Sequence, residues 1–390
     1  MIKNCLIGLL LSLSAGVAVA NQLGQYTATR VQHAHNLAQQ DKLEQAISTL
    51  EALDLARGYD QAFVARMLGI LYWQNDQVTP AIQQLDLAVT SGLLQDEQAW
   101  QTRKMLADML LNEQQYSQAL PHYYNLSESA SDRQTVPEIW LRIAQSHYQL
   151  QQWSKVLTAI ARYEHYPQPD QLSPLSLKLS AQLELKQWSP AIKTIKRLIA
   201  IEPARMEWWR QLVALYLRVG DEKGALDAMA LAKLDGIALS QDDLKLLAQL
   251  YAKRGVPERA AMVLAQLDQI DVDSKLKAQQ ASYWQSAKEW QKSIASWRVA
   301  AQLDSQYYWN LSQLLAQEGH YQQALAALDK VTGRHAEVAL IKARAYYKLQ
   351  RIEDALANAK RANEISPSKQ AQSWVKYLSQ LRSVKSSQNS

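Results

Sequence analysis

Apolar positions in this sequence recur with the period of an α-helix, in blocks that return along the chain. Within residues 368–382, Trp374, Tyr377, Leu378 and Leu381 follow one another at intervals of three, one and three, which places them on one helical stripe. Elsewhere an aromatic or polar residue stands three positions before a small residue, and an apolar run follows. Residues 188–192 and 321–325 are examples. These patterns predict helices throughout the chain.

The small residue of this pattern recurs with a period of about 34 residues, which is in the range of helical repeat proteins. The ten anchors are Ala46, Ala81, Ala119, Val156, Ala191, Ala225, Ala260, Ser293, Ala324 and Ala355. Their spacing is longest between Ala81 and Val156 and shortest after Ser293. A single pair of helices cannot bury its apolar face alone, so repeats of this kind stack on their neighbours and share a core. The small residues are expected where the two helices of a pair approach most closely.

The repeat resembles the tetratricopeptide (TPR) family, whose unit of about 34 residues is a helix–turn–helix with a W-x2-L-G-x2-Y start, a central Ala and a late Pro. The matching positions are Leu68, Gly69, Tyr72, Trp140, Ile143, Ala144, Trp209, Leu212, Tyr216, Leu247, Ala248, Tyr251, Pro203 and Pro367. The fifth repeat departs from the pattern at Leu179 and Gln182. The resemblance covers about residues 27–367. It implies an all-α TPR solenoid, a right-handed superhelix of about ten helix–turn–helix repeats with a capping helix.

The two ends of the chain differ from the repeats. Residues 1–20 combine Lys3, an apolar run and an Ala18-Val19-Ala20 cleavage pattern, which predicts a signal peptide. A retained N-terminal anchor is the alternative. The predicted organisation is a signal peptide over 1–20, a TPR array over 21–367, a capping helix over 368–382 and a disordered tail over 383–390. Residues 127–135 and 166–174 are predicted to be joints within the array.

Composition excludes several other classes of protein. Twelve Gly and ten Pro are too few for the turns of a β-sandwich or for glycine-rich nucleotide loops, and one Cys cannot form a disulfide framework. The net charge of +5 is spread along the chain, whereas nucleic-acid binding needs a clustered basic face. After removal of the signal peptide, no segment is long and apolar enough to cross a membrane. The mature chain would lack Cys, which suits an oxidising compartment and favours the periplasm of a Gram-negative bacterium.

No catalytic or metal-binding motif accompanies the repeats. His33 and His35 point about 200° apart on a helix, so they are poorly placed to chelate one ion. Asp242 and Asp243 follow Ser240, which predicts a helix N-cap with acidic residues in the first turn. We therefore expect no enzyme, no cofactor and no metal. An active site assembled from distant repeats remains the alternative.

The TPR resemblance also implies which residues line the concave groove. The implied partner-binding residues are Phe63, Arg66, Ile70, Trp73, Lys104, Asp108, Asn112, Tyr148, Arg210, Arg218, Lys245, Gln249, Trp309, Arg344 and Tyr347. Trp, Tyr and Arg are the residues that most often anchor interfaces. For each aromatic residue the alternative is packing between repeats. The Lys/Asn clamp by which some TPR proteins hold a C-terminal carboxylate is not reproduced, because Asp108 and Gln249 stand where Asn is needed.

These observations predict a periplasmic scaffold that binds a protein or peptide in its groove. The layout is similar to that of periplasmic TPR proteins encoded beside TonB–ExbB–ExbD components, and this resemblance implies a role in TonB-dependent transport with TonB, ExbB or ExbD as partners. The alternative is a cell-envelope assembly or polysaccharide-export accessory whose aromatic side chains bind glycan.

Overall fold

The computed structural model describes residues 23–56, 58–129 and 135–388, with side chains up to residue 384. The predicted signal peptide and most of the joint at 127–135 lie outside these residues. The chain divides into two compact units, Met1–Pro203 and Ala204–Ser390, and each is described by itself. In the described ranges every regular element is a helix, as the hydrophobic pattern predicts.

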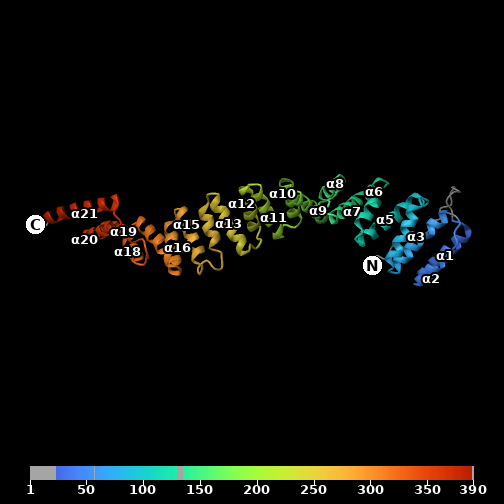
Figure 1. Ribbon diagram of the computed structural model, residues 1–390, viewed down its shortest axis with the longest axis horizontal. Helices are drawn as coiled ribbons and strands as arrows, with labels where there is room; N and C mark the ends of the chain where they lie inside the picture. Colours follow the sequence, from blue (N-terminus) through green and yellow to red (C-terminus); the bar gives the residue numbers. More distant parts are fainter. Residues whose placement is uncertain (1–22, 57, 130–134, 389–390) are drawn as a thin grey trace. The chain divides into compact units, whose positions relative to one another are not determined.

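In the described residues of the first unit, ten helices follow one another in chain order (Figure 1). Each packs against the next, so that five antiparallel hairpins form a stack. The helices are α1 (Gln25–Gln39), α2 (Leu43–Glu51), α3 (Gly58–Gln74), α4 (Val78–Thr90), α5 (Asp96–Asn112), α6 (Tyr116–Ser129), α7 (Val136–Gln149), α8 (Trp153–Glu164), α9 (Leu172–Glu184) and α10 (Trp188–Ile201).

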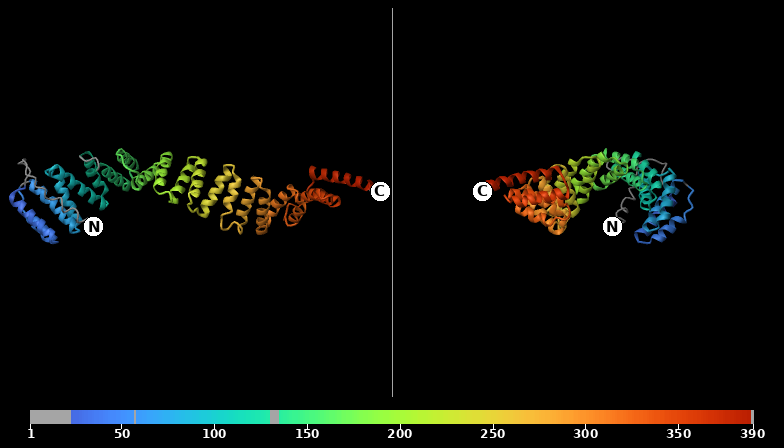
Figure 2. Two further views of the ribbon diagram at one scale, coloured as in Figure 1. Left: turned by 180° about the vertical axis from the view of Figure 1, so that it is seen from behind. Right: turned by 60° about the vertical axis from the view of Figure 1, so that its left-hand side comes forward.

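The second unit continues the same pattern with five further hairpins and one additional helix (Figure 2). Its elements are α11 (Met206–Arg218), α12 (Glu222–Leu234), α13 (Gln241–Lys253), α14 (Pro257–Leu264), α15 (Ser274–Ser286), α16 (Trp290–Leu303), the short 3-10 helix η2 (Ser305–Tyr307), α17 (Tyr308–Gln317), α18 (Tyr321–Leu328), α19 (His335–Lys348), α20 (Ile352–Ile365) and α21 (Lys369–Gln388).

Each of the ten hairpins turns through one residue in the left-handed region. These residues are Asp41, Asp76, Gln114, Gln151, Lys186, Gly220, Gly255, Lys288, Gly319 and Gln350, with φ between 55° and 80°. The residue that follows donates its N–H to the carbonyl five positions before it, as in Gln77 to Tyr72 and Glu289 to Trp284. This is the 6→1 bond of a Schellman motif, which ends the first helix of each hairpin and starts the second.

The anchor residues predicted from the sequence stand five positions after these left-handed residues, in the second helix of each hairpin. All ten anchors, including Val156 and Ser293, are completely buried. Ser293 donates its hydroxyl to the carbonyl of Ala281 in the facing helix at 2.8 Å, which explains how a polar residue occupies this position. The complete burial of all ten anchors agrees with the predicted position of the small residues between packed helices.

One turn in the second unit is fixed by a cap that the sequence predicts. Ser240 accepts the N–H of Asp243 and Asp243 accepts the N–H of Ser240, which is a capping box at the start of α13. Helix α12 starts in a related way, because Asp221 accepts the N–H of Gly224.

The last helix is longer than the predicted capping helix. The stripe formed by Trp374, Tyr377 and Leu378 is present, and Leu378 is fully buried against α19 and α20. However, α21 does not end at residue 382 but continues to Gln388, through most of the segment predicted to be disordered. The segment has no Pro or Gly to end a helix, so the α21 backbone continues beyond its last buried residues. Among the described residues, no helix is long and apolar enough to cross a bilayer.

Candidate functional site

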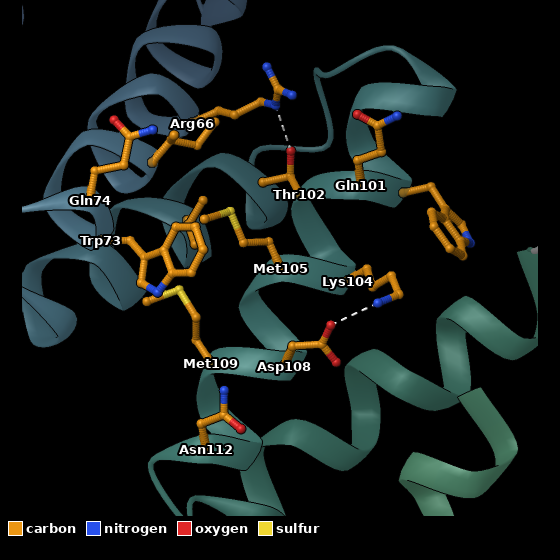
Figure 3. Close-up of a pocket in the computed structure, with 13 residues that line it drawn as sticks. Arg66, Trp73, Gln74, Gln101, Thr102, Lys104, Met105, Asp108, Met109 and Asn112 are labelled. Carbon is orange, nitrogen blue, oxygen red and sulfur yellow. Dashed lines mark hydrogen bonds and ion pairs between the residues drawn. The ribbon is translucent and has the colours of Figure 1, made fainter. Parts of the chain in front are cut away.

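A cavity of about 410 Å³ opens between α3 and α5 in the first unit (Figure 3). Helix α4 packs against both of these helices and contributes Leu85 to the cavity floor. The cavity is lined by Arg66, Ile70, Trp73, Gln74, Leu85, Trp100, Gln101, Thr102, Lys104, Met105, Asp108, Met109 and Asn112. Six of these, Arg66, Ile70, Trp73, Lys104, Asp108 and Asn112, are groove residues predicted from the sequence. The structure therefore brings six predicted residues together in one site.

The helical period explains why these side chains share one face. On α3, Arg66, Ile70, Trp73 and Gln74 are separated by four, three and one residues, which places them on one stripe. On α5 the corresponding stripe contains the side chains of Gln101, Lys104, Met105, Asp108 and Asn112. Both helices thus turn a mixed polar and apolar stripe toward the cavity.

The cavity has a cationic end and an apolar end. At the cationic end the Arg66 Nε donates to the Thr102 Oγ1 at 3.1 Å. Seven residues later on α3, which is about 10 Å along the helix axis, the ring of Trp73 lies beside Met105 and Met109 (Figure 3). Ile70 and Leu85 extend this apolar end.

Arg66 is partly buried, and no carboxylate of the described residues pairs with it. Within the described residues, the hydrogen bond to Thr102 is the only one that the Arg66 side chain makes. The hydroxyl of Thr102 itself donates to the Gln98 carbonyl at 2.6 Å. Burial lowers the pKa of the Arg66 guanidinium, and the nearby Tyr59 opposes this effect. Since an arginine stays protonated in proteins, the site contains a positive charge that no described side chain neutralises.

The second cation of the site is neutralised within the chain. The Lys104 Nζ lies 2.8 Å from the Asp108 Oδ2 and 3.9 Å from the Glu138 Oε1. The other oxygen of Asp108 accepts the hydroxyl of the buried Tyr123 at 2.6 Å. Burial and the carboxylate of Asp108 both raise the pKa of Tyr123, so its phenol stays protonated and holds Asp108 in place.

Two predicted residues of the first unit lie outside the cavity. Phe63 is partly buried against the core formed by α1, α2 and α3, with its ring centroid 6.3 Å from that of Tyr59. Tyr148 packs on the core around α6, α7 and α8, and its ring meets Trp153 edge-on at 5.4 Å. Both side chains pack within the stack, which is the alternative considered for the aromatic residues.

The predicted residues of the second unit are spread over several helices and do not share a described cavity. Arg210 donates to Asp243 at 2.8 Å, while Lys245 lies 3.4 Å from the exposed Asp242. The guanidinium of Arg334 lies 5.1 Å from the centre of the Trp309 ring. Arg218, Gln249 and Arg344 are exposed on α11, α13 and α19.

Tyr347 belongs to an aromatic cluster with α21. Its ring meets Trp374 and Tyr377 at centroid distances of 5.6 Å each, and its hydroxyl lies 2.8 Å from that of Tyr377. This residue therefore joins the last hairpin to the additional helix.

Seven lining residues of the cavity were not predicted from the sequence: Gln74, Leu85, Trp100, Gln101, Thr102, Met105 and Met109. Met105 follows Gln101 by four positions and Met109 follows Met105 by four, so the helical period on α5 contained the signal. Leu85 lies on α4, the second helix of its hairpin. The TPR resemblance implied groove residues on the first helix of each hairpin only, so Leu85 was not among them.

The structure defines the class of the molecule as an α-helical repeat protein. Residues 305–334, which contain η2, α17 and α18, match the family model described as "Tetratricopeptide repeat". This match covers one of the ten hairpins, and the other nine share its helix–turn–helix arrangement within an all-helical repeat fold. No curated protein sequence matches the chain.

Several solved structures are similar to parts of this chain. A MamA protein is 20% identical over 40% of this chain and 88% of its own, with a TM-score of 0.33. The C-terminal part of a TPR repeat-containing protein from Cytophaga hutchinsonii is 16% identical over 69% and 98%, with a TM-score of 0.33. The P58(IPK) TPR domain is 11% identical over 94% and 100%, with a TM-score of 0.26.

Proposed function

We propose that this protein is an interaction scaffold that binds a segment of another protein in the cavity between α3 and α5. The observation that carries the proposal is the cavity itself, in which an apolar floor of Ile70, Trp73, Met105 and Met109 lies beside the polar groups of Arg66, Gln101 and Asn112. Binding sites in proteins commonly combine an apolar lining with a few placed polar groups. The TPR fold supports protein partners in general.

The dimensions of the cavity suit a short stretch of chain. Its lining on α5 extends from Trp100 to Asn112, which is roughly 18 Å at 1.5 Å per residue. An extended peptide covers this length with about five residues. Trp73 and Arg66 are of the two residue types that most often contribute large binding energies, and they stand at opposite ends of the site.

Site-directed photocrosslinking tests this proposal. A photoreactive residue in place of Asn112, at the rim of the cavity, should yield a discrete cross-linked partner in cells, and the additional substitution Trp73→Ala should abolish that product. Asp86, which is exposed on α4, is the matched control position. A product that forms equally from both positions, or that survives loss of Trp73, would contradict binding in the cavity.

The proposal places the protein in the periplasm of a Gram-negative bacterium. The support is the signal-like sequence of residues 1–20, which lies outside the described residues, and the absence of Cys from the sequence that follows it. Fusion of alkaline phosphatase to the full chain should give active enzyme, whereas the same fusion without residues 1–20 should not. Equal activity of both fusions would rule out export by this segment.

A narrower form of the proposal assigns the protein to TonB-dependent transport, with TonB, ExbB or ExbD components as partners. Its support is the resemblance in layout to periplasmic TPR proteins encoded beside those components. Deletion of the gene should then slow growth under iron limitation, and re-expression should restore it. Normal growth of the deletion strain would remove this assignment and leave the scaffold proposal intact.

Binding of glycan, for envelope assembly or polysaccharide export, is the second candidate function. Trp73 and Trp100 favour it, because both line the cavity and aromatic rings can pack on sugar rings. Retention of envelope polysaccharide by the wild type and its loss in Trp73→Ala would support this function. A glycan array on which nothing is retained would exclude it.

A further inference from the structure

The unpaired charge of Arg66 indicates the chemistry of the bound segment. The Arg66 Nε is occupied by Thr102, but neither terminal nitrogen donates to a side chain or carbonyl of the described residues. A guanidinium presents two parallel N–H groups that match the two oxygens of a carboxylate. The other charges of the cavity, Lys104 and Asp108, already compensate each other.

We infer that the cavity between α3 and α5 recognises an acidic segment of a partner protein, in which an Asp or Glu side chain pairs with Arg66 while an apolar side chain of the same segment packs on Trp73, Met105 and Met109. This inference rests on the proposed function, and it adds the identity of the recognised side chains.

The spacing of the two ends of the cavity defines the spacing in the ligand. Arg66 and Trp73 are seven residues apart on α3, or about 10 Å along the axis. An extended chain advances about 3.3 Å per residue, so the acidic and the apolar residue are three positions apart. Binding aligns the acidic residue with Thr102 and the apolar residue with Met109, because Arg66 lies beside Thr102 and Trp73 beside Met109 (Figure 3).

The site fits a carboxylate on a side chain better than the end of a chain. Recognition of a C-terminal carboxylate commonly uses free backbone N–H groups. Around Arg66 and Thr102 both helices are in their interiors, where the backbone N–H groups already bond to carbonyls four residues earlier. The available donors are the terminal nitrogens of Arg66, because the Gln101 Nε2 already donates to the Glu97 Oε1 at 2.7 Å. The lining continues past Trp73 to Asn112, where the partner chain can run on.

Synthetic peptides test the inference with the full chain without residues 1–20. The acidic probe is the amidated peptide Glu-Gly-Ser-Leu-Ser-Gly-Glu, which carries a carboxylate three positions from Leu in either chain direction. The neutral probe replaces both Glu by Gln. A third probe, Gly-Ser-Leu-Ser-Gly-Gly, has only uncharged side chains and carries its carboxylate at a free C-terminus. All carry the same N-terminal fluorophore, and binding is measured by fluorescence anisotropy at low salt.

We expect the wild type to bind the acidic probe about tenfold more tightly than the neutral one, which corresponds to about 1.4 kcal/mol. Arg66→Gln should weaken binding of the acidic probe most and bring the two affinities within about twofold, and Trp73→Ala should weaken both. Arg103→Gln is the matched control, because it removes one positive charge from α5 at a position outside the cavity lining, and it should retain the tenfold preference. Circular dichroism and thermal unfolding verify that each variant is folded.

Four results would overturn the inference. These are equal binding of the acidic and neutral probes, equal weakening of both by Arg66→Gln, tighter Arg66-dependent binding of the free C-terminus, and no binding of either amidated probe. The first three still show a segment bound in the groove, so they leave the proposed function standing. The photocrosslinking from Asn112 tests that function separately.

Discussion

Arg210 and Asp243 lie on the first helices of consecutive hairpins, α11 and α13, and their side chains bond directly. The Arg210 Nε lies 3.0 Å from the Asp243 Oδ1 and Nη2 lies 2.8 Å from Oδ2, across a sequence separation of 33 residues. The same separation joins Thr27 to Asp60 and Arg197 to Glu164. A hydrogen bond between consecutive hairpins fixes the register of one repeat on the next, in addition to the shared apolar core.

Asp243 is expected to stabilise the second unit at neutral pH. Its carboxylate is buried, and hydrogen bonds from Arg210 and Ser240 lower its pKa from 3.8 to about 2 despite the burial. Asp243→Ala removes this pairing and the capping box of α13, which should cost about 2–3 kcal/mol in free energy of unfolding. Denaturant unfolding measures the loss in free energy of unfolding, and hydrogen exchange of the α13 amides shows whether the loss is located in that helix. Asp242→Ala, at the neighbouring exposed position, should change stability by less than about 0.5 kcal/mol.

The Asp243 contribution should also depend on pH. Because the folded-state pKa lies below the ordinary value, the stabilisation is complete above about pH 4 and is lost as the pH falls toward 2. The variant Asp243→Asn should therefore lose less stability than the wild type between these two pH values. The free energy of unfolding of both proteins is measured from about pH 4 to about pH 2. An equal loss in the two proteins would contradict the lowered pKa of Asp243.

Gly69 is required by the close approach of α3 to α4. A Cβ atom at this position would lie 2.6 Å from the Leu85 Cγ and 3.2 Å from the Ala81 carbonyl oxygen. Gly69→Ala should therefore lower the free energy of unfolding by roughly 1–3 kcal/mol despite the better helix propensity of alanine. Gly58→Ala is the control, since the described part of the chain places only the mobile Cδ1 end of Leu93 near its Cβ position. Equal effects of both substitutions on the unfolding midpoint would show that helix propensity, and not the contact between α3 and α4, determines the change in stability.

The sequence predicted the repeat well because the constraint at each hairpin is local. Gly69 and the anchors such as Ala225 had to be small, and the spacing of the anchors was visible as a period of about 34 residues. The turn geometry was not predictable in the same way, because seven of the ten left-handed positions carry residues such as Lys186 and Gln350 in place of glycine. There the packing of both helices imposes a conformation that the residue itself disfavours.

The candidate site was predictable where one helix face determined it. Ile70 and Trp73 line the cavity because the α3 stripe faces α5, whereas Phe63 on the same helix packs against α1 and α2. The sequence could not distinguish these positions, since the direction of a side chain depends on how the neighbouring helices are placed. It also could not indicate that, among the described residues, Lys104 has a carboxylate partner and Arg66 has none.

The left-handed turn residues that are not glycine offer a route to a more stable protein. Lys288 has a φ of 60° between α15 and α16, where a Cβ atom is unfavourable. Lys288→Gly should raise the free energy of unfolding by about 0.5–1 kcal/mol. The reverse change, Gly255→Ala, should lower it by a similar amount, because that glycine has a φ of 76° and no described atom within 4 Å of its Cβ position. Thermal unfolding of the two variants should move in opposite directions from the wild type.

His147 is expected to make the stability of the first unit sensitive to mild acid. Its ring is buried, with Nδ1 2.8 Å from the Gln152 Oε1 and Nε2 2.8 Å from the Tyr124 hydroxyl. Burial lowers the pKa of His147, an effect that the hydrogen bond to Gln152 opposes. Since the unfolded chain binds the proton more readily, this contribution to stability is complete above about pH 6.5 and decreases as the pH falls below that value.

A histidine variant with a matched control tests this dependence. His147→Gln should lower stability at pH 7.5 by about 1–3 kcal/mol, because buried hydrogen bonds are lost, and should reduce the further loss between pH 7.5 and pH 5.5. His165→Gln, at an exposed position on the same part of the chain, should retain the pH dependence of the wild type. An unchanged pH slope in His147→Gln would assign the sensitivity to another group.

The additional helix α21 closes the last hairpin, and Leu378 is its central contact. This side chain is fully buried in a cluster with Ala343, Leu356 and Ala359 of α19 and α20. Leu378→Ala should cost about 2–5 kcal/mol through the lost apolar burial and the cavity that remains. The exposed Tyr377 provides the control, because Tyr377→Phe keeps the ring contact with Trp374 and should leave the unfolding midpoint nearly unchanged.

Truncation before Lys369 should expose the face of α20 and cause self-association, which light scattering would detect. A truncated chain that stays monomeric and as stable as the wild type would show that the repeats need no cap at this end.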